Sequence, residues 1–425
     1  MDSRPSARLG SINALRGIAA LMVAGYHIWG HYGVYPFPSI GVVPQAINPS
    51  IFSYLVSPLR WGYLGVSLFL VLSGFCIHLP FARKRKEKGN YGFAARPFYL
   101  RRLWRLYPAY AVSVIGTYLL LWVASRTTHL VDFMPTFGDL TAHLTFTHGY
   151  FDKYFYGIVH VYWSLALEFQ LYLAYPLFLY VFKKIGLTKS IVGLTAFSIV
   201  WRWASLDIFH YNLISISTTG PYTMMGFLFA RMPEWLFGVW VAEWFASGKS
   251  FAVNFSLFGS RRLPLVAVSV MVLFSAIFSS LSELLWPLTD ILFGLGFAFA
   301  VGASVIPAIE GVSAARFYRF SPYHSLVWVG TISYSIYLFH MQLSWFANPW
   351  IHGFHGGAVP FFLRIIVLAC SIPIIAVIYR LVEAPFLKLP KPGDRYFTLY
   401  TRIRKFIGIK TDTSLPVQFG GSISS

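Results

Sequence analysis

The sequence predicts an all-α polytopic membrane protein with about ten transmembrane helices and both termini in the cytoplasm. Two features of its composition predict this class: 56% of the 425 residues are hydrophobic, and only 12% are charged. A third is that the apolar residues gather in runs of about 20, the length of helix that crosses a bilayer. A helix also satisfies its own backbone hydrogen bonds, as lipid requires.

The expected spans follow from the positions of the apolar runs. The first run holds Arg16 and His27 and shows no small-residue cleavage site, so we expect a retained helix and not a signal peptide. The spans are expected at residues 12–32, 61–81, 106–125, 160–182, 190–206, 226–246, 264–281, 286–306, 326–347 and 361–381. We expect a transmembrane domain over residues 1–385 and a basic cytoplasmic tail over 386–425, with its stretch 395–409 on the membrane surface.

The orientation follows from the basic residues in the connections. Lys and Arg gather in alternate connections and in both terminal segments, whereas the opposite connections hold only Arg60, Arg126 and Lys153. Basic connections stay in the cytoplasm, so both termini are expected there, in an inner (cytoplasmic) membrane. The net charge of +19 therefore reflects topology, and we expect no nucleic-acid partner.

Metal and disulfide chemistry find little support in the sequence. Cys76 and Cys370 each lie inside an apolar run and form no disulfide or zinc framework. His143 and His148, in the long outer connection 126–159, lack a set of further ligands, so we expect no metal site. The outer connections 33–60 and 126–159 are rich in aromatic residues and are expected to cap an outward cavity.

Ionisable residues inside spans are the main functional candidates, because they are costly in lipid. Arg16 and His27 are eleven residues apart, so they share one helix face about 16 Å apart. Imidazole can take a proton from a hydroxyl, and guanidinium can hold an anionic group. Arg102 and Arg105, three apart at the inner start of the third span, could hold such a group or anchor the helix.

Two polar stripes complete the candidates. Ser164, Glu168 and Tyr172 are spaced by fours on the fourth span, and the carboxylate needs a partner. We weigh four candidate partners: His27, Arg16, Arg231 and Glu234. The ninth span carries a second stripe, Ser333, Tyr337 and His340, that either lines the outer half of a cavity or bonds between helices. Gly65, Ser73 and Gly74 are small enough to let helices approach closely.

Taken in order, these residues resemble the membrane-bound acyltransferase 3 family, which includes O-antigen and exopolysaccharide O-acetylases. The resemblance runs from Leu15 to about Phe386. Its landmarks are Arg16 with His27, Ser73-Gly74-Phe75, Arg102 with Arg105, Trp163-Ser164-Leu165 with Glu168, Tyr172 and Pro176, Arg231 to Glu234, Ser333 to His340, and Glu383-Ala384-Pro385-Phe386. The chain departs from the family at Ser67 and Phe169, where acidic residues are frequent, and we expect no C-terminal hydrolase-like domain.

The resemblance implies an integral membrane O-acyltransferase that moves an acyl group, expected to be acetyl, from cytoplasmic acyl-CoA to a hydroxyl of a saccharide or glycolipid. His27 is implied as the base, with Glu168 beside it in the catalytic set. No bound cofactor is expected, since acyl-CoA is a substrate. We assign donor binding to Arg16, Arg102, Arg105, Ser73 and Tyr107, and the acceptor side of the cavity to Trp163, Ser164, Tyr172, Arg231, Glu234, Tyr337 and His340.

Two other functions remain open at this point. Ten helices with buried Arg, His and Glu also suit a proton-coupled secondary transporter, although no inverted repeat is visible. A non-enzymatic partner of a polysaccharide assembly complex is the third possibility. Release of free thiol from acyl-CoA distinguishes the enzyme from both.

Overall fold

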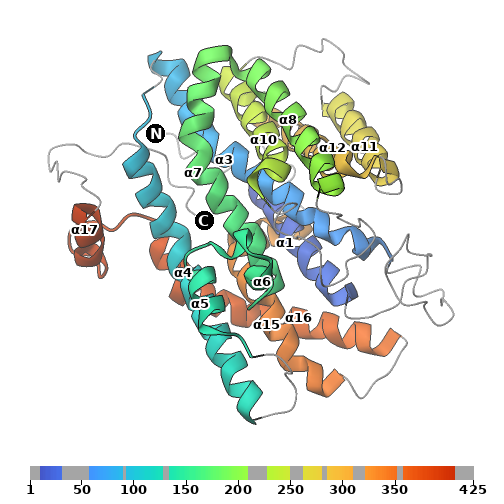
Figure 1. Cartoon of the computed structure of the whole chain (residues 1–425), viewed down its shortest axis with the longest axis vertical. Helices are drawn as coiled ribbons and strands as arrows, with labels where there is room; N and C mark the ends of the chain where they lie inside the picture. The colour runs from blue at the N-terminus through green and yellow to red at the C-terminus, as the bar shows by residue number, and fades with distance from the viewer. Residues whose placement is uncertain are drawn as a thin grey trace.

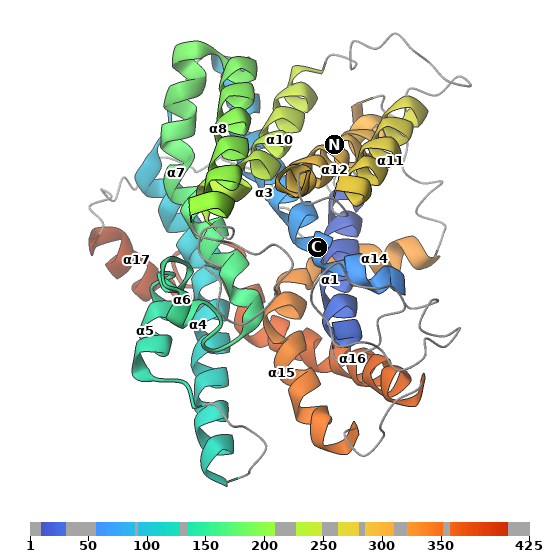
Figure 2. The same ribbon diagram turned by 45° about the vertical axis from the view of Figure 1, so that its right-hand side comes forward.

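The computed structural model describes residues 10–30, 57–89, 92–127, 134–208, 227–248, 262–279, 285–309, 321–351 and 358–406. Within these ranges the chain is helical and has no strand. Figures 1 and 2 show a bundle in which α1 lies among the other helices. Five helical segments in these ranges are long and apolar enough to cross a membrane: Trp61–Lys88, Ala95–Arg126, His160–Ile185, Thr289–Ile306 and Phe361–Phe386.

Nine of the ten expected spans fall mainly on one helix each, and the ninth falls on two. The helices are α1 (Gly10–Gly30), α3 (Gly65–Lys88), α4 (Ala95–Thr127), α7 (Trp163–Ile185), α8 (Leu187–Ile208), α10 (Leu228–Ser247), α11 (Arg262–Ser279), α12 (Thr289–Ile309), α15 (Ser333–Ile351) and α16 (Ala358–Ile378). The positions of the helices are therefore confirmed. Ten membrane crossings and cytoplasmic termini stay predictions.

The ninth expected span, 326–347, was wrong as a single helix. The chain forms α14 (Ser321–Thr331) and then α15, with the break at Ile332. Gly330, near the end of α14, allows this helix to pack closely against α1, since a Cβ there would lie 1.8 Å from the Asn13 carbonyl oxygen. Hydropathy continues across such a break, so an apolar run does not reveal it.

The basic connection expected at 82–105 is mostly helical. α3 continues to Lys88 and α4 already begins at Ala95, so Arg102 and Arg105 lie on a helix and not in a loop. Lys and Arg are good helix formers in water, which lets both helices extend beyond their apolar parts.

The connection 126–159 contains short helices in its described part, residues 134–159. α5 (Phe137–Leu144) begins with a capping box between Thr136 and Asp139, and α6 (Asp152–Phe155) follows. Of the other expected cap, 33–60, only residues 57–60 are described, within the 3-10 helix η2 (Ser57–Leu64).

Glycines set the closest helix crossings, as the sequence predicts for Gly65 and Gly74. A Cβ on Gly74 of α3 would lie 2.0 Å from the Trp235 carbonyl oxygen of α10. A Cβ on Gly238 of α10, the glycine that faces α3, would lie 2.0 Å from the Val71 carbonyl oxygen. A Cβ on Gly65 would lie 2.5 Å from the Ala19 carbonyl oxygen of α1. The helix α3 therefore packs closely against both α1 and α10.

The end of the described chain docks on the start of α4. α16 continues through a π-helical turn, η6 (Tyr379–Glu383), and a 3-10 turn, η7 (Ala384–Phe386). α17 (Phe397–Phe406) then lies beside α4 (Figure 1), where the Trp104 and Tyr400 rings are 5.4 Å apart. Trp104 Nε1 also donates to the Lys388 carbonyl at 3.2 Å. The tail therefore lies at the same end of the bundle as the arginines of α4.

Candidate functional site

Three arginines from two helices converge near one end of the bundle. Arg16 of α1 interacts electrostatically with Arg105 of α4, and also with two carboxylates, Glu168 and Glu383. Arg102 interacts with Arg105 and with Tyr172. Like charges repel when they are brought together out of water, so the two carboxylates and any bound anion stabilise this arginine cluster. The structure thus brings together the three predicted donor-binding arginines.

Glu383 joins this cluster through the π-helical turn that ends α16. The Ser335 hydroxyl of α15 donates to Glu383 Oε2 at 2.5 Å, and the side chain is 3% exposed. The sequence suggested Glu383 only through the resemblance. Its position in a π-helical turn is a feature often found at functional sites.

Glu168 is held by two hydroxyl groups. Ser73 Oγ of α3 donates to Glu168 Oε1 at 2.7 Å, and the Tyr172 hydroxyl, one turn further along α7, donates to the same oxygen. The indole nitrogen of Trp235 lies 3.4 Å from Ser73 Oγ. Of the partners weighed for Glu168 from sequence, Arg16 lies within electrostatic range, but no hydrogen bond joins Glu168 to His27 among the described residues.

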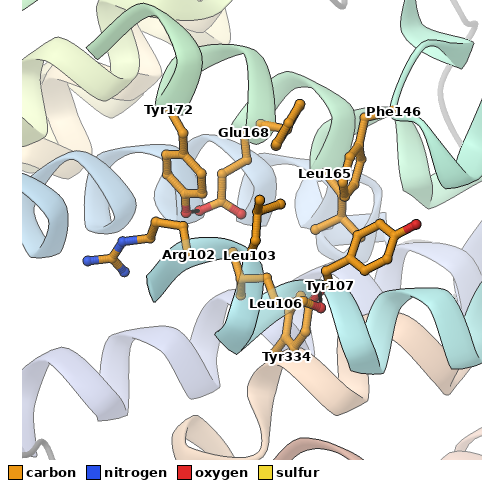
Figure 3. A pocket seen from close by; sticks show the side chains of 10 residues that line it. Arg102, Leu103, Leu106, Tyr107, Phe146, Leu165, Glu168, Tyr172 and Tyr334 are labelled. Atoms are coloured by element: carbon orange, nitrogen blue, oxygen red, sulfur yellow. Dashed lines mark hydrogen bonds between the residues drawn. The ribbon is translucent and has the colours of Figure 1, made fainter. Parts of the chain in front are cut away.

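A mostly apolar pocket lies between α4, α7 and α15, next to the arginine cluster. About 350 Å³ of space lies among its lining atoms when the open solvent at its mouth is included. Figure 3 shows Glu168 and Tyr172 meeting at one side of it, with Tyr107 and Tyr334 at the other. The lining residues are Arg102, Leu103, Leu106, Tyr107, Phe146, Leu165, Glu168, Phe169, Tyr172 and Tyr334. Phe169, one of the two positions where the sequence departs from the family pattern, thus forms part of the aromatic wall of this pocket.

Two histidines meet further along α1 and α15. His340 Nε2 lies 3.2 Å from His27 Nδ1, and the ring centroids are 5.1 Å apart. His27 Nδ1 also lies 2.8 Å from the Val23 carbonyl oxygen, one turn back on α1. The sequence placed His27 and His340 in the same cavity but gave no reason to pair them. His27 and Arg16 both face the interior, as the shared helix face predicts.

Tyr337 joins the histidine pair to α7. Its hydroxyl lies 2.5 Å from Ser164 Oγ and donates to the Val161 carbonyl at 3.0 Å. Its ring centroid is 6.2 Å from that of His340. Interhelical hydrogen bonding, one of the two interpretations of this stripe, is therefore present.

Arg231 and Glu234 belong to a separate buried ion cluster. Arg231 Nε lies 2.8 Å from Glu234 Oε2, and Arg231 Nη1 is 2.8 Å from Asp290 Oδ2 of α12. Arg202 of α8 completes the cluster, with its Nη2 2.7 Å from Asp290 Oδ2. The Arg231 guanidinium carbon also lies 5.8 Å from the centre of the Trp163 ring. This cluster provides partners for Arg231 and Glu234 other than Glu168.

Sequence reasoning missed several buried polar residues. Arg202 and Asp290 were not singled out, although Arg202 is an ionisable residue inside an expected span and is fully buried. A third cluster joins His78 of α3 to Glu243 of α10 at 2.7 Å and to the Tyr175 hydroxyl at 2.9 Å. Arg85 contacts the second oxygen of Glu243. A charged residue inside an apolar run is the signal that could have identified them, had it been considered in every run.

Metal ligation finds no support in this geometry. No group of three or more His, Cys, Asp or Glu side chains is placed to hold a metal ion within the described ranges. The His143 and His148 rings stack at 4.0 Å with an angle of 2° between their planes.

Comparison with known proteins identifies the family to which the chain is similar. The family model described as "Acyltransferase domain" matches residues 9–380. The chain is 26% identical over 371 residues to the peptidoglycan O-acetyltransferase OatA of Listeria monocytogenes, covering 80% of this chain and 50% of that protein. It is 24% identical over 342 residues to a provisionally named O-acetyltransferase of Staphylococcus aureus strain COL, covering 78% and 53%. The chain thus spans about half the length of these relatives. No solved structure matches significantly.

Proposed function

The chain belongs to the acyltransferase 3 family, and on this premise we propose that it is an integral membrane O-acyltransferase. The donor is acyl-CoA from the cytoplasm, with acetyl as the acyl group, and the acceptor is a hydroxyl of a saccharide or glycolipid. The acyl carbon leaves the thioester sulfur and bonds to the acceptor oxygen. The hydroxyl proton ends on the coenzyme A thiol.

The arginine cluster supports binding of an anionic donor. Arg16, Arg102 and Arg105 concentrate positive charge at one end of the bundle, where phosphate groups bind favourably. Arg102 Nε is buried and has no hydrogen-bond partner among the described residues, so this donor is available to an oxyanion. Tyr107 lines the adjoining pocket, whose apolar walls suit the pantetheine arm.

One observation carries the proposal: a single helix, α15, reaches from the pocket to the histidine pair. Tyr334 lines the pocket, and His340, six residues further on, contacts His27. Six residues span about 9 Å along a helix, so a thioester arm that fills the pocket extends toward His27.

His27 acts as the general base in this mechanism. Its Nδ1 faces the Val23 carbonyl oxygen, an acceptor, so the neutral ring carries its proton on Nδ1 and its lone pair on Nε2. Nε2 then takes the proton from the acceptor hydroxyl and returns it to the departing thiolate. Attack on the thioester by Nε2 itself, with an acyl-histidine intermediate, is the second route.

Glu168 contributes charge near the thioester and does not orient the imidazole directly. Ser73 and Tyr172 fix its carboxylate beside the arginine cluster and the pocket. The acceptor binds on the side of His27 where Tyr337 and Ser164 join α15 to α7. Trp163, beside Arg231 of the buried ion cluster with Glu234, belongs to the same acceptor side in this proposal.

The test is thiol release from acetyl-CoA by protein reconstituted in liposomes with a sugar acceptor. We expect His27→Ala to lower kcat by about 10²- to 10⁴-fold, the usual contribution of a general base. His324→Ala, at an exposed histidine of α14, is the matched control and keeps wild-type turnover. Arg102→Ala raises the KM for acetyl-CoA.

Two outcomes contradict the proposal. If His27→Ala folds and retains wild-type turnover, His27 is not the base. If the wild-type protein moves a sugar across the liposome membrane without releasing thiol, the chain is a carrier and the transferase assignment fails.

A further inference from the structure

Both ring nitrogens of His340 contact a neighbouring polar atom. Its Nδ1 lies 2.9 Å from the Ile336 carbonyl oxygen and 3.1 Å from that of Tyr337. Its Nε2 lies 3.2 Å from His27 Nδ1. The side chain is 4% exposed, so these contacts define its environment.

The contacts fix the proton positions on both rings. A carbonyl oxygen only accepts, so His340 Nδ1 must carry the proton. The neutral ring then has an unprotonated Nε2, which is an acceptor. His27 Nδ1 must therefore be the donor in the contact between the two rings, and it shares its proton between His340 Nε2 and the Val23 carbonyl oxygen.

We propose that His340 is a positioning residue for His27: it accepts the Nδ1 proton of His27 and thereby directs the basic Nε2 toward the acceptor hydroxyl. This inference rests on the proposed transferase function. In this role His340 acts through its contact with His27 and needs no contact with either substrate.

The bond strengthens at the step where His27 takes up the acceptor proton. The imidazolium ring is then charged, and a hydrogen bond from a charged donor is about twice as strong as a neutral one. The neutral His340 ring, which accepts through Nε2, stabilises the positive charge on His27. A carboxylate in its place would hold the proton more tightly. The proton therefore remains available for return to the thiolate.

The kinetic test compares two substitutions of His340. His340→Leu removes the acceptor, and we expect kcat to fall by about 10- to 100-fold with little change in the KM for acetyl-CoA. His340→Gln places an amide oxygen near the position of Nε2, and we expect it to restore most of kcat. Gln342→Leu is the control for loss of a buried polar group, since the Gln342 amide donates to Tyr162 and Thr117 and no hydrogen bond joins it to either histidine within the described ranges.

A double substitution tests whether His340 acts through His27. His27→Ala/His340→Leu should be no slower than His27→Ala alone, because residues that act as one unit are not additive. An additive loss, or equal losses in His340→Leu and Gln342→Leu, overturns the proposal.

A spectroscopic test does not depend on turnover. In protein labelled with ¹⁵N-histidine, the ring nitrogen shifts should show His27 and His340 both protonated at Nδ1. Protonation of His27 at Nε2 overturns the inference even if the protein is an acyltransferase. Absence of thiol release from a protein with the expected shifts instead overturns only the proposed function.

Discussion

At the scale of single residues, the site depends on contacts between side chains from different helices, such as that of His27 with His340. Residue types and spacing put Arg16 and His27 on one interior face, and the structure agrees. They could not tell that His27 pairs with His340, because that contact joins positions 313 apart in the chain. Pairing across such distances depends on how helices pack, which one sequence does not reveal.

A residue-scale prediction concerns Tyr172. Its hydroxyl donates to Glu168, so Tyr172→Phe leaves a partly buried carboxylate with one fewer partner. We expect a loss of about 1–3 kcal/mol in the free energy of unfolding, measured by thermal denaturation in detergent. Tyr180→Phe, at an exposed tyrosine of the same helix, is the control and should change stability by less than about 0.5 kcal/mol. Equal stability of the two variants would show that the bond to Glu168 contributes nothing.

At the scale of helices, prediction from sequence succeeded where the signal was long. Nine of the ten expected apolar runs fall mainly on one helix each, because a helix satisfies its own backbone hydrogen bonds in lipid. The break at Ile332 and the extension of α4 back to Ala95 were missed. At both places the backbone conformation changes without a matching change in hydropathy: the apolar run continues through Ile332, and α4 begins in a basic segment.

The crossing of α3 and α10 yields a prediction at this scale. Gly74→Ala places a methyl group against the Trp235 carbonyl oxygen, so the helices must separate. We expect the free energy of unfolding to fall by about 1–3 kcal/mol, as for other overpacked sites. Gly116→Ala of α4 is the matched control, because a Cβ there meets nothing within 4 Å. A thermal midpoint for Gly74→Ala as high as that of Gly116→Ala would contradict the tight crossing.

The stacked histidines near α5 predict a loss of stability in acid. Burial lowers the pKa of His143 to about 4, and burial together with His143 lowers the pKa of His148 to about 3. Both rings are neutral when folded, whereas the unfolded chain binds protons below its ordinary pKa of about 6.5. Stability is therefore complete above about pH 6.5 and falls as pH drops toward 4, by up to about 1.4 kcal/mol per histidine per pH unit.

The measurement is thermal stability in detergent between pH 7.5 and pH 5. His148→Asn should flatten the decline, whereas His324→Asn, at an exposed site, should leave it unchanged. A wild-type midpoint that does not fall between pH 7 and pH 5 would show that the pair is not held neutral by burial.

At the scale of the whole molecule, the charge distribution predicts which end of the bundle faces the cytoplasm. The arginine cluster, the end of α3 and the docked tail lie at one end, and α6 belongs to the connection expected outside. Under the proposed function, this predicted orientation would place the arginines on the side from which acyl-CoA approaches.

Cysteine labelling in intact cells tests this orientation. In a chain with Cys76 and Cys370 replaced by alanine, Lys153→Cys should react with a membrane-impermeant maleimide from outside. Lys88→Cys should react only after permeabilisation; both positions are exposed. The reverse pattern would invert the topology and separate the arginine cluster from its donor.

The π-helical turn η6 has a consequence for the spacing of the chain. A π turn holds one residue more than an α turn, and each residue of an ordinary helix rotates the chain by about 100°. The extra residue turns Glu383 toward Ser335 and sets the direction in which the chain runs on to Trp104. Shortening this turn by a single residue would swing the carboxylate away from the arginines and carry the docked tail off α4, although every side chain of the site remained in the sequence.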